Sequence, residues 1–266
     1  MTASRSAARP RPLSKLQLQE DSPDPRAGAV SSWDISTGVD GPGTRFVVFL
    51  AGCELRCLYC QNPETWHMRD GTRMPATEVI AEAAKYARFI SVSGGGATIS
   101  GGEPLLQPDF AHELLRGFKG LGLHTALDTS GALGHRASDE LLADVDLVLL
   151  DIKSWDRETY RRVTGGEVRP TLDFAIRLAE LERPTVVRFV LVPGHTDDVA
   201  NVEGAAEFIG GLPNVLQVDV LPFHRMATPK YDDLGLTYQL ADTLPPSPEL
   251  LHRVREQFRS HGLIAS

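Results

Sequence analysis

The sequence contains no continuous run of about 18 apolar residues, the length that a membrane-spanning helix needs. It also has no excess of basic residues, because 27 Lys and Arg stand against 35 Asp and Glu, for a formal net charge of −8. A basic face is the usual mark of a nucleic-acid binder, and this balance does not indicate one. We therefore expect a protein that acts neither in a membrane nor on nucleic acid.

Cysteine is scarce, with three residues in the whole chain, and all three fall within eight positions. An odd number at this spacing makes a poor disulfide framework, so a reducing, cytoplasmic compartment is the better interpretation. Residues 1–19 carry basic side chains and no acidic ones, but they lack the apolar centre of a secretory signal. We predict that residues 1–29, rich in proline and polar residues, form a flexible extension, with an organellar transit peptide as the alternative.

From residue 30 onward, apolar runs of strand length alternate with helix-like segments. The length of the chain suits one α/β barrel domain over residues 30–266. The predicted strands are rich in Val, Ile and Leu and lie at Arg45–Leu50, Ala97–Ser100, His124–Asp128, Asp146–Asp151, Thr185–Val192 and Val215–Leu221. Helices are predicted after Thr77 as N-cap and at Pro108–Lys119, Ser138–Ala143, Thr171–Glu182, Asp198–Ile209 and Ser247–His261. Six β/α units in series predict an open, partial barrel of parallel strands.

Polar residues recur where these predicted strands end. Gly101, Gly102 and Glu103 follow the second strand, Asp128 and Thr129 end the third, Asp151 and Lys153 end the fourth, and His224 follows the sixth. Asp and Gly can simply terminate strands. However, active sites of parallel barrels lie at the carboxyl ends of the strands, so the recurrence favours one shared site.

The three cysteines, Cys53, Cys57 and Cys60, follow the first predicted strand and therefore lie at the mouth of the barrel. Thiolates are soft ligands that suit iron–sulfur clusters or zinc. A four-iron cluster normally takes one cysteine per iron, so three cysteines would leave one iron open to a substrate. Zinc held by three Cys and His67 is an alternative, although the first gap of three residues is unusual for a zinc site. A nucleophilic cysteine would not need three close thiols.

The cysteine segment resembles the signature of the radical S-adenosylmethionine (SAM) enzymes, and specifically that of the activating enzymes of glycyl-radical enzymes. The matching residues are Gly41, Gly43, Arg45, Phe49, Gly52, Cys53, Cys57, Cys60 and Asn62. Further motifs follow in the family's order, namely Ser93–Gly96, Ser100–Pro104, Leu127–Gly131, Asp151–Lys153 and Leu221–His224. The resemblance covers about residues 30 to 261.

The resemblance implies an enzyme that binds a four-iron, four-sulfur cluster through Cys53, Cys57 and Cys60, with SAM on the fourth iron. Reductive cleavage of SAM would yield a 5′-deoxyadenosyl radical that removes hydrogen from a backbone glycine of a partner enzyme. Because no cysteines remain for an additional cluster region, the resemblance favours the compact members that act on pyruvate formate-lyase. A flavodoxin or ferredoxin would supply the electron, and the chain would be a monomer.

The resemblance also implies roles for individual residues. SAM contacts are expected from Tyr59, Cys60, Gln61, Gly101, Gly102, Glu103, Asp151, Ile152, Lys153 and His224. A monovalent cation is expected at Asp128, Thr129 and Asp151, and the partner peptide at Asp40. An activase of another glycyl-radical enzyme, a radical SAM enzyme of small molecules and a non-catalytic iron–sulfur or zinc protein remain as alternatives.

Overall fold

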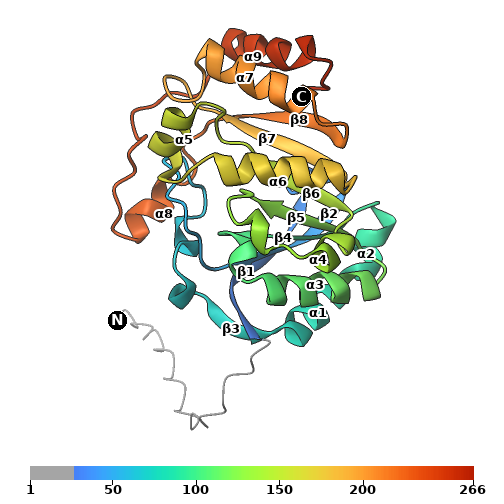
Figure 1. Cartoon of the computed structure of the whole chain (residues 1–266). Coiled ribbons are helices and arrows are strands. Elements are labelled where there is room, and N and C mark those ends of the chain that lie inside the picture. Colours follow the sequence, from blue (N-terminus) through green and yellow to red (C-terminus); the bar gives the residue numbers. More distant parts are fainter. Residues whose placement is uncertain (1–26) are drawn as a thin grey trace, which may run out of the picture.

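The computed structural model describes residues 27–266, and one curved sheet runs through this part of the chain (Figure 1). The strand order is β3-β1-β2-β4-β5-β6-β7-β8. The strands are β1 (Ala27–Thr37), β2 (Thr44–Leu50), β3 (Thr72–Pro75), β4 (Gly96–Gly101), β5 (His124–Thr129), β6 (Leu147–Asp151), β7 (Thr185–Leu191) and β8 (Val215–Pro222). Residues 1–26 of the predicted extension at 1–29 lie outside the described residues. Residues 27–29 belong to β1.

Six strands pair in parallel, namely β2, β4, β5, β6, β7 and β8. This pairing confirms the predicted open barrel of six β/α units. Two strands were not predicted. β1 pairs antiparallel with β2, and β3 pairs antiparallel with β1 at one edge of the sheet. Their sequences hid them, because Gly, Ser, Asp and Thr interrupt the apolar residues of β1 and β3 has only four residues.

Helices follow the parallel strands, as the alternating pattern predicts. They are α1 (Ala76–Ala84), α2 (Ala87–Val92), α3 (Pro108–Gly120), α4 (Asp139–Ala143), α5 (Arg157–Thr164), α6 (Arg169–Glu180), α7 (Val199–Gly210), α8 (Thr228–Asp233) and α9 (Pro248–Ser260). Thr77 as an N-cap was wrong, because α1 begins one residue earlier and Pro75 precedes it. The short helices α2, α5 and α8 were missed. None of these helices combines the length and apolar character needed to cross a bilayer.

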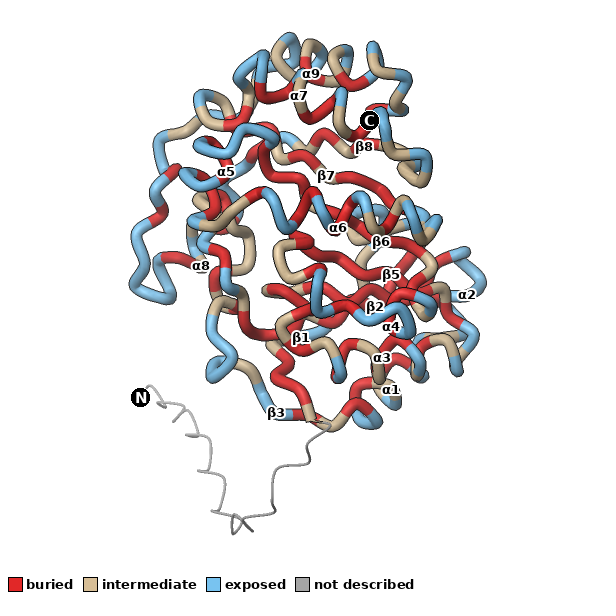
Figure 2. Tube along the Cα trace, viewed as in Figure 1, coloured by how far each residue is buried: buried red, intermediate tan, exposed pale blue. Residues whose placement is uncertain are grey.

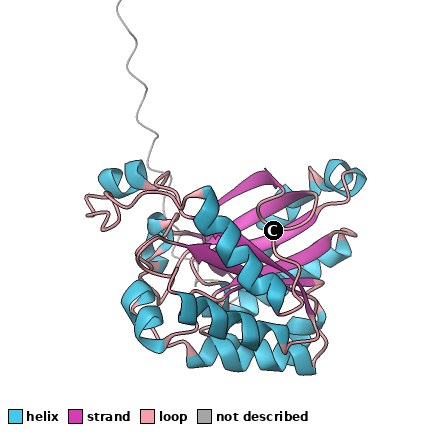
Figure 3. Ribbon diagram, turned by 90° about the horizontal axis from the view of Figure 1, so that it is seen from above, coloured by secondary structure: helices cyan, strands magenta, loops and turns pink. Residues whose placement is uncertain are grey.

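The apolar core lies between the curved sheet and the helices (Figures 2 and 3). Strand residues such as Val48, Ile99 and Leu150 are fully buried and pack against helix residues such as Leu114 and Ala205. Figure 2 shows the strands as buried and the outer surfaces of the helices as exposed. This packing fixes the carboxyl ends of the parallel strands relative to one another, which is what a shared site requires.

The loop between β1 and β2 closes the amino-terminal end of the sheet. Arg45, the second residue of β2, is fully buried there without a carboxylate in hydrogen-bond contact. Its guanidinium donates to the hydroxyl of Thr98 at 2.5 Å and to the carbonyl oxygens of Pro42, Ala97 and His124. A buried charge is tolerated when it is fully hydrogen-bonded, so Arg45 ties this loop to β4 and β5.

Candidate active site

A cavity of about 550 Å³ lies at the carboxyl ends of the parallel strands. It belongs to the size range typical of small-molecule sites. Most of the predicted site residues line it: Asp40, Cys53, Cys57, Tyr59, Cys60, Gln61, Gly101, Gly102, Asp128, Thr129, Asp151, Lys153 and His224. Residues that lie up to 184 positions apart in the chain therefore meet in one place, as the strand-end pattern predicted.

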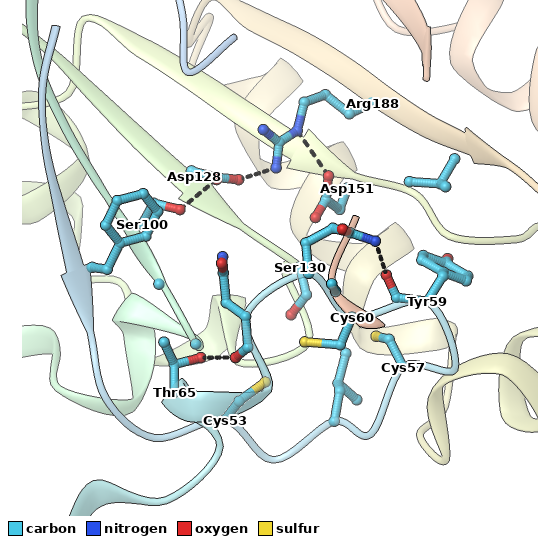
Figure 4. Close-up of a pocket in the computed structure, with 18 of the residues that line it drawn as sticks. Cys53, Cys57, Tyr59, Cys60, Thr65, Ser100, Asp128, Ser130, Asp151 and Arg188 are labelled. Atoms are coloured by element: carbon cyan, nitrogen blue, oxygen red, sulfur yellow. Dashed lines mark hydrogen bonds and ion pairs between the residues drawn. The ribbon is translucent and has the colours of Figure 1, made fainter. Parts of the chain in front are cut away.

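The three cysteines lie on one side of this cavity (Figure 4). They are free thiols on the loop that follows β2. The loop is held by backbone bonds from Arg56 to Thr164 and from Leu58 to Val163, so α5 supports it from outside. Burial raises the pKa of Cys57 to about 11 and also raises the pKa values of Cys53 and Cys60. In the absence of a metal the thiols are therefore protonated at neutral pH, and binding a soft cation would displace their protons.

The arrangement does not favour a zinc ion. Within residues 27–266, no group of three or more His, Cys, Asp or Glu side chains is placed to hold a single metal ion. His67, the residue proposed as the fourth zinc ligand, lines a different pocket on the outer side of the cysteine loop. All three cysteines line the main cavity, and a cluster would offer each thiolate its own iron.

Backbone rather than side chains forms the wall at the end of β4. A Cβ atom on Gly102 would lie 2.2 Å from the carbonyl oxygen of Gly52, so no larger residue fits there. Gly101 has φ +116, and a Cβ on it would lie 2.2 Å from the amide nitrogen of Leu50. These two glycines keep the strand end close to the cysteine loop and leave their backbone open to a ligand.

A network of charges occupies the side of the cavity opposite the cysteines (Figure 4). Arg188 of β7 donates to Asp151 at 2.9 Å and to Asp128 at 2.5 Å. Lys153 pairs with the other oxygen of Asp151 at 2.9 Å, and the hydroxyl of Ser100 donates to Asp128 at 2.7 Å. The sequence reasoning missed Arg188, although a charged residue inside the apolar run Thr185–Val192 was a usable signal.

These contacts set the charge states. Burial by itself raises the pKa of Asp151, but Arg188 and Lys153 outweigh it and lower the value to about 2. Burial raises the pKa of Asp128, and the Arg188 guanidinium offsets this only in part. Burial by itself lowers the pKa of Arg188, but the two facing carboxylates outweigh burial, so the pKa is raised. The site thus presents two fixed cations, Lys153 and Arg188, beside ionised Asp151.

The predicted cation site at Asp128, Thr129 and Asp151 coincides with this network. Both carboxylates are bonded to the Arg188 guanidinium, and the hydroxyl of Thr129 donates to Glu103 at 2.7 Å. The Arg188 guanidinium therefore bridges the two carboxylates, and Lys153 adds a second positive charge beside Asp151. The monovalent cation stays a prediction.

Tyr59, Gln61 and His224 form a third part of the cavity. Nε2 of Gln61 donates to the carbonyl oxygens of Tyr59 at 3.1 Å and of His224 at 3.4 Å, so the cysteine loop is joined to the end of β8. The Tyr59 ring lies 5.8 Å from Nζ of Lys153, and its buried hydroxyl has no hydrogen-bond partner within residues 27–266. An apolar ring face beside free polar atoms suits a flat heteroaromatic group.

Two predicted contact residues do not line the cavity. Ile152 is fully buried in the core. Glu103 is also fully buried, and its carboxylate accepts from the hydroxyls of Thr129 and Ser130 and from the amides of Ser130 and Leu105. Burial raises the pKa of Glu103 to about 7 despite these donors. Glu103 joins the end of β4 to the end of β5, so its side chain positions the loops that form the wall.

Asp40 reaches the cavity from the loop that Arg45 secures. The hydroxyl of Thr98 accepts from Nε of Arg45 at 2.5 Å and donates to the backbone carbonyl of Asp40 at 2.7 Å. A Cβ on Gly43 (φ +70) would lie 2.6 Å from the backbone of Gly95, so the loop fits closely against the start of β4. These contacts place the Asp40 side chain at the cavity although its backbone lies at the amino-terminal end of the sheet.

The cavity therefore combines soft thiol ligands, cationic side chains, open glycine backbone and an aromatic wall. This set fits an iron–sulfur cluster together with a small zwitterionic ligand that carries a heteroaromatic ring. The thiols suit iron, Lys153 and Arg188 suit a carboxylate, and the backbone beside Gly102 suits an amino group. Fold and site together define a barrel enzyme with cluster chemistry at the strand ends.

Comparison with known proteins agrees with this class. Residues 47–205 match the radical SAM superfamily. The pyruvate formate-lyase-activating enzyme of Listeria monocytogenes is 44% identical over 230 residues, which cover 84% of this chain and 93% of that protein. A solved domain of a pyruvate-formate lyase-activating enzyme from Bacteroides vulgatus has a TM-score of 0.55 at 28% identity, covering 65% of this chain and 98% of that domain. A radical SAM methyltransferase from Sphaerobacter thermophilus shares the fold, with a TM-score of 0.62 at 16% identity over 90% of this chain and 76% of that chain.

These likenesses extend over nearly all of the described residues. The chain belongs to the radical SAM superfamily and, within it, to the family of the pyruvate formate-lyase-activating enzymes. The expected family, an enzyme class that works with a [4Fe-4S] cluster and SAM, is thereby confirmed.

Proposed function

We propose that this chain activates pyruvate formate-lyase under anaerobic conditions by generating a glycyl radical in that enzyme. The proposal rests on one observation: Cys53, Cys57 and Cys60 line the same cavity as Lys153 and Gly102. The relatives at 41–44% identity bear the name of this activity. When bound, the cluster and SAM supply a 5′-deoxyadenosyl radical that removes hydrogen from a glycine of the partner enzyme.

The protein's own residues bind, orient and shield the reactants. The three cysteines would hold three irons of the cluster, and since the chain has no fourth cysteine, we assign the fourth iron to SAM. Lys153 and Arg188 attract the methionyl carboxylate, and the backbone at Gly101 and Gly102 lies open to the methionyl amino group.

The adenine end of SAM is assigned to the part of the cavity between the cysteine loop and the end of β8. Tyr59 and Gln61 offer a ring face and an amide beside His224, which lies at the end of β8. Asp40 lies at the cavity on the closed end of the barrel, where its carboxylate can accept a hydrogen bond from the backbone of the partner's glycine loop.

The remaining parts of the proposal concern the surroundings of this reaction. The chain acts as a monomer and receives its electron from a flavodoxin or a ferredoxin. A monovalent cation at Asp128, Thr129 and Asp151 requires Arg188 to release at least one carboxylate. Replacing potassium by tetramethylammonium in the assay tests this site, and unchanged activity would remove the cation from the proposal.

Anaerobic reconstitution followed by two measurements tests the function. The reduced holoenzyme is mixed with SAM and purified pyruvate formate-lyase, and 5′-deoxyadenosine is measured by chromatography and the glycyl radical by electron paramagnetic resonance. We expect both products in comparable amounts. Cys53→Ala, Cys57→Ala or Cys60→Ala should abolish both. A radical signal only with a different glycyl-radical enzyme would reassign the partner, and no 5′-deoxyadenosine from a loaded cluster would refute the enzyme class.

A further inference from the structure

A second, shallow pocket of about 260 Å³ lies on the outer side of the cysteine loop. Of the three cysteines, only Cys53 lines it. Cys53 and Trp66 line both this outer pocket and the main cavity, so they form the wall between the two. A cluster held by the cysteines is therefore separated from the surface at this place by single side chains.

Three exposed arginines from separate segments surround the outer pocket. Arg56, in the cysteine loop, donates to the carbonyl oxygen of Cys53 at 2.7 Å, and its guanidinium lies 5.1 Å from the centre of the Trp66 ring. Arg69 lines the pocket directly. Arg136, which follows β5, donates at 3.0 Å to the carbonyl oxygen of Leu106, another lining residue.

The charge of this surface differs from that of the whole protein. The chain carries a formal net charge of −8. Two exposed acidic side chains lie beside the outer pocket: Glu54, which lines it, and Asp70, which lies 3.7 Å from Arg69, while Glu103 also lies near Cys53 but is fully buried. Three arginines thus face two carboxylates, and the local balance is positive. An acidic protein partner would be repelled by most of the surface and attracted here.

The proposed reaction needs an electron donor that does not enter through the main cavity. SAM and the glycine loop of the partner enzyme would fill that cavity while the cluster is being reduced. The outer pocket approaches the same cluster site from the other side of Cys53. Electron transfer favours the shortest separation, so the outer pocket is the suitable entrance.

We propose that Arg56, Arg69 and Arg136 with the outer pocket, here called the arginine surface, dock an acidic one-electron carrier protein that reduces the cluster beside Cys53. This inference rests on the proposed function, because only a cluster enzyme needs the electron. One electron leaves the carrier, which is oxidised, and enters the cluster, which is reduced, and no bond forms or breaks. The arginines orient the carrier so that its redox group faces Cys53.

The decisive experiment compares two triple variants of the reconstituted holoenzyme. Arg56→Glu, Arg69→Glu and Arg136→Glu together reverse the arginine surface. Arg88→Glu, Arg116→Glu and Arg169→Glu make the same change in net charge on the exposed faces of α2, α3 and α6. The probe is a purified FMN-containing flavodoxin, and its dissociation constant is measured anaerobically at several salt concentrations.

We expect reversal of the arginine surface to raise the dissociation constant roughly tenfold or more at low salt and to remove most of its salt dependence. Reduction of the cluster by flavodoxin, followed by electron paramagnetic resonance, should slow to a similar degree. The control variant should stay within about twofold of the parent in both measurements, since rim charges far from a contact matter little. The proposal would be overturned if both variants weakened flavodoxin binding equally, or if neither variant weakened it.

Dithionite separates docking from damage to the cluster, because this small reductant needs no docking surface. We expect dithionite-driven formation of 5′-deoxyadenosine to be unchanged in the arginine-surface variant. If it falls, the loss of the Arg56 bond to Cys53 has altered the loop, and the variant with only Arg69→Glu and Arg136→Glu decides: unchanged flavodoxin affinity there refutes the proposal. A parent protein that binds flavodoxin but makes no 5′-deoxyadenosine with dithionite would refute the proposed function and leave the arginine surface in place.

Discussion

Two arginines, Arg45 fully buried and Arg188 mostly buried, hold opposite ends of the same sheet, and their partners differ in kind. Arg45, at the start of β2, donates to a hydroxyl and to backbone carbonyls. Arg188, beside the end of β6, donates to the carboxylates of Asp128 and Asp151. Burial therefore lowers the pKa of Arg45 to about 10, while the two carboxylates raise the pKa of Arg188.

The difference indicates which end of the sheet is fixed by its contacts and which end can rearrange when a ligand binds. At the Arg45 end the acceptors are mostly neutral carbonyl oxygens, whose positions are fixed by the backbone. The carboxylates of the Arg188 end can exchange partners when a ligand brings its own charges into the cavity. A cation surrounded by neutral acceptors thus supports the architecture, and a cation between carboxylates serves a binding site.

The largest effect is expected from Arg188→Met. Removing this cation leaves two carboxylates buried side by side, which should cost about 3–5 kcal/mol of stability at pH 8. Lys153 still pairs with Asp151 in this variant, but Asp128 loses its guanidinium partner, so its pKa, already raised by burial, rises further and the folded state takes up a proton as the pH falls. The deficit should therefore shrink between pH 8 and pH 5, as measured by urea unfolding. A deficit that does not change with pH would contradict this account of Arg188.

A buried carboxylate without a cationic hydrogen-bond partner sharpens the comparison. Glu103 has a pKa of about 7 in the folded protein against a reference of 4.5, so the folded state binds its proton more tightly. Its contribution to stability is fully present below about pH 4.5 and is lost as the pH rises to 7, by about 3 kcal/mol. Glu103→Gln should remove this slope. Parallel curves of unfolding free energy against pH for the two proteins would show that Glu103 does not titrate in this range.

A smaller effect is expected from Arg45→Met. This substitution leaves buried carbonyl oxygens, rather than carboxylates, without a hydrogen-bond donor. It should lower the free energy of unfolding by about 2 kcal/mol. Because no carboxylate is bonded to Arg45, the loss should depend on pH far less than that of Arg188→Met, with only a modest decrease toward pH 5, because burial and Arg45 lower the pKa of the neighbouring His124. Urea unfolding at the two pH values provides the measurement, with Arg188→Met as the contrasting variant. A strong pH dependence would mean that Asp40 or Asp146 depends on Arg45 more than the geometry indicates.

The smallest effect is expected from Thr98→Val, which removes the hydroxyl between Arg45 and Asp40 while keeping the shape of the side chain. We expect a loss of about 1 kcal/mol in stability and a several-fold rise in KM for the partner enzyme. Formation of 5′-deoxyadenosine in the absence of the partner should stay unchanged. Thr98→Ser keeps the hydroxyl and should restore the KM, which a purely structural role of Thr98 would not predict.

Predictions from the sequence succeeded where local pattern carries the information. The six parallel strands were found within one or two residues, because buried strands read as short apolar runs bounded by polar residues. The antiparallel strand β1 and the helix α5 were missed, since polar residues interrupt the apolar ones in β1 and α5 is short and mostly polar. The strand-end residues Asp128, Asp151 and Lys153 were found because a barrel brings the ends of its strands together.

The sequence by itself determined that Cys53, Cys57 and Cys60 lie on one loop beside a parallel sheet, because spacing and apolar period are local properties. It also determined the family, through motifs that follow in a fixed order. The tertiary structure alone decided that Arg188 pairs with both Asp128 and Asp151, and that Glu103 turns away from the cavity. These contacts join different strands, and which side chain reaches which partner depends on the curvature and register of the sheet.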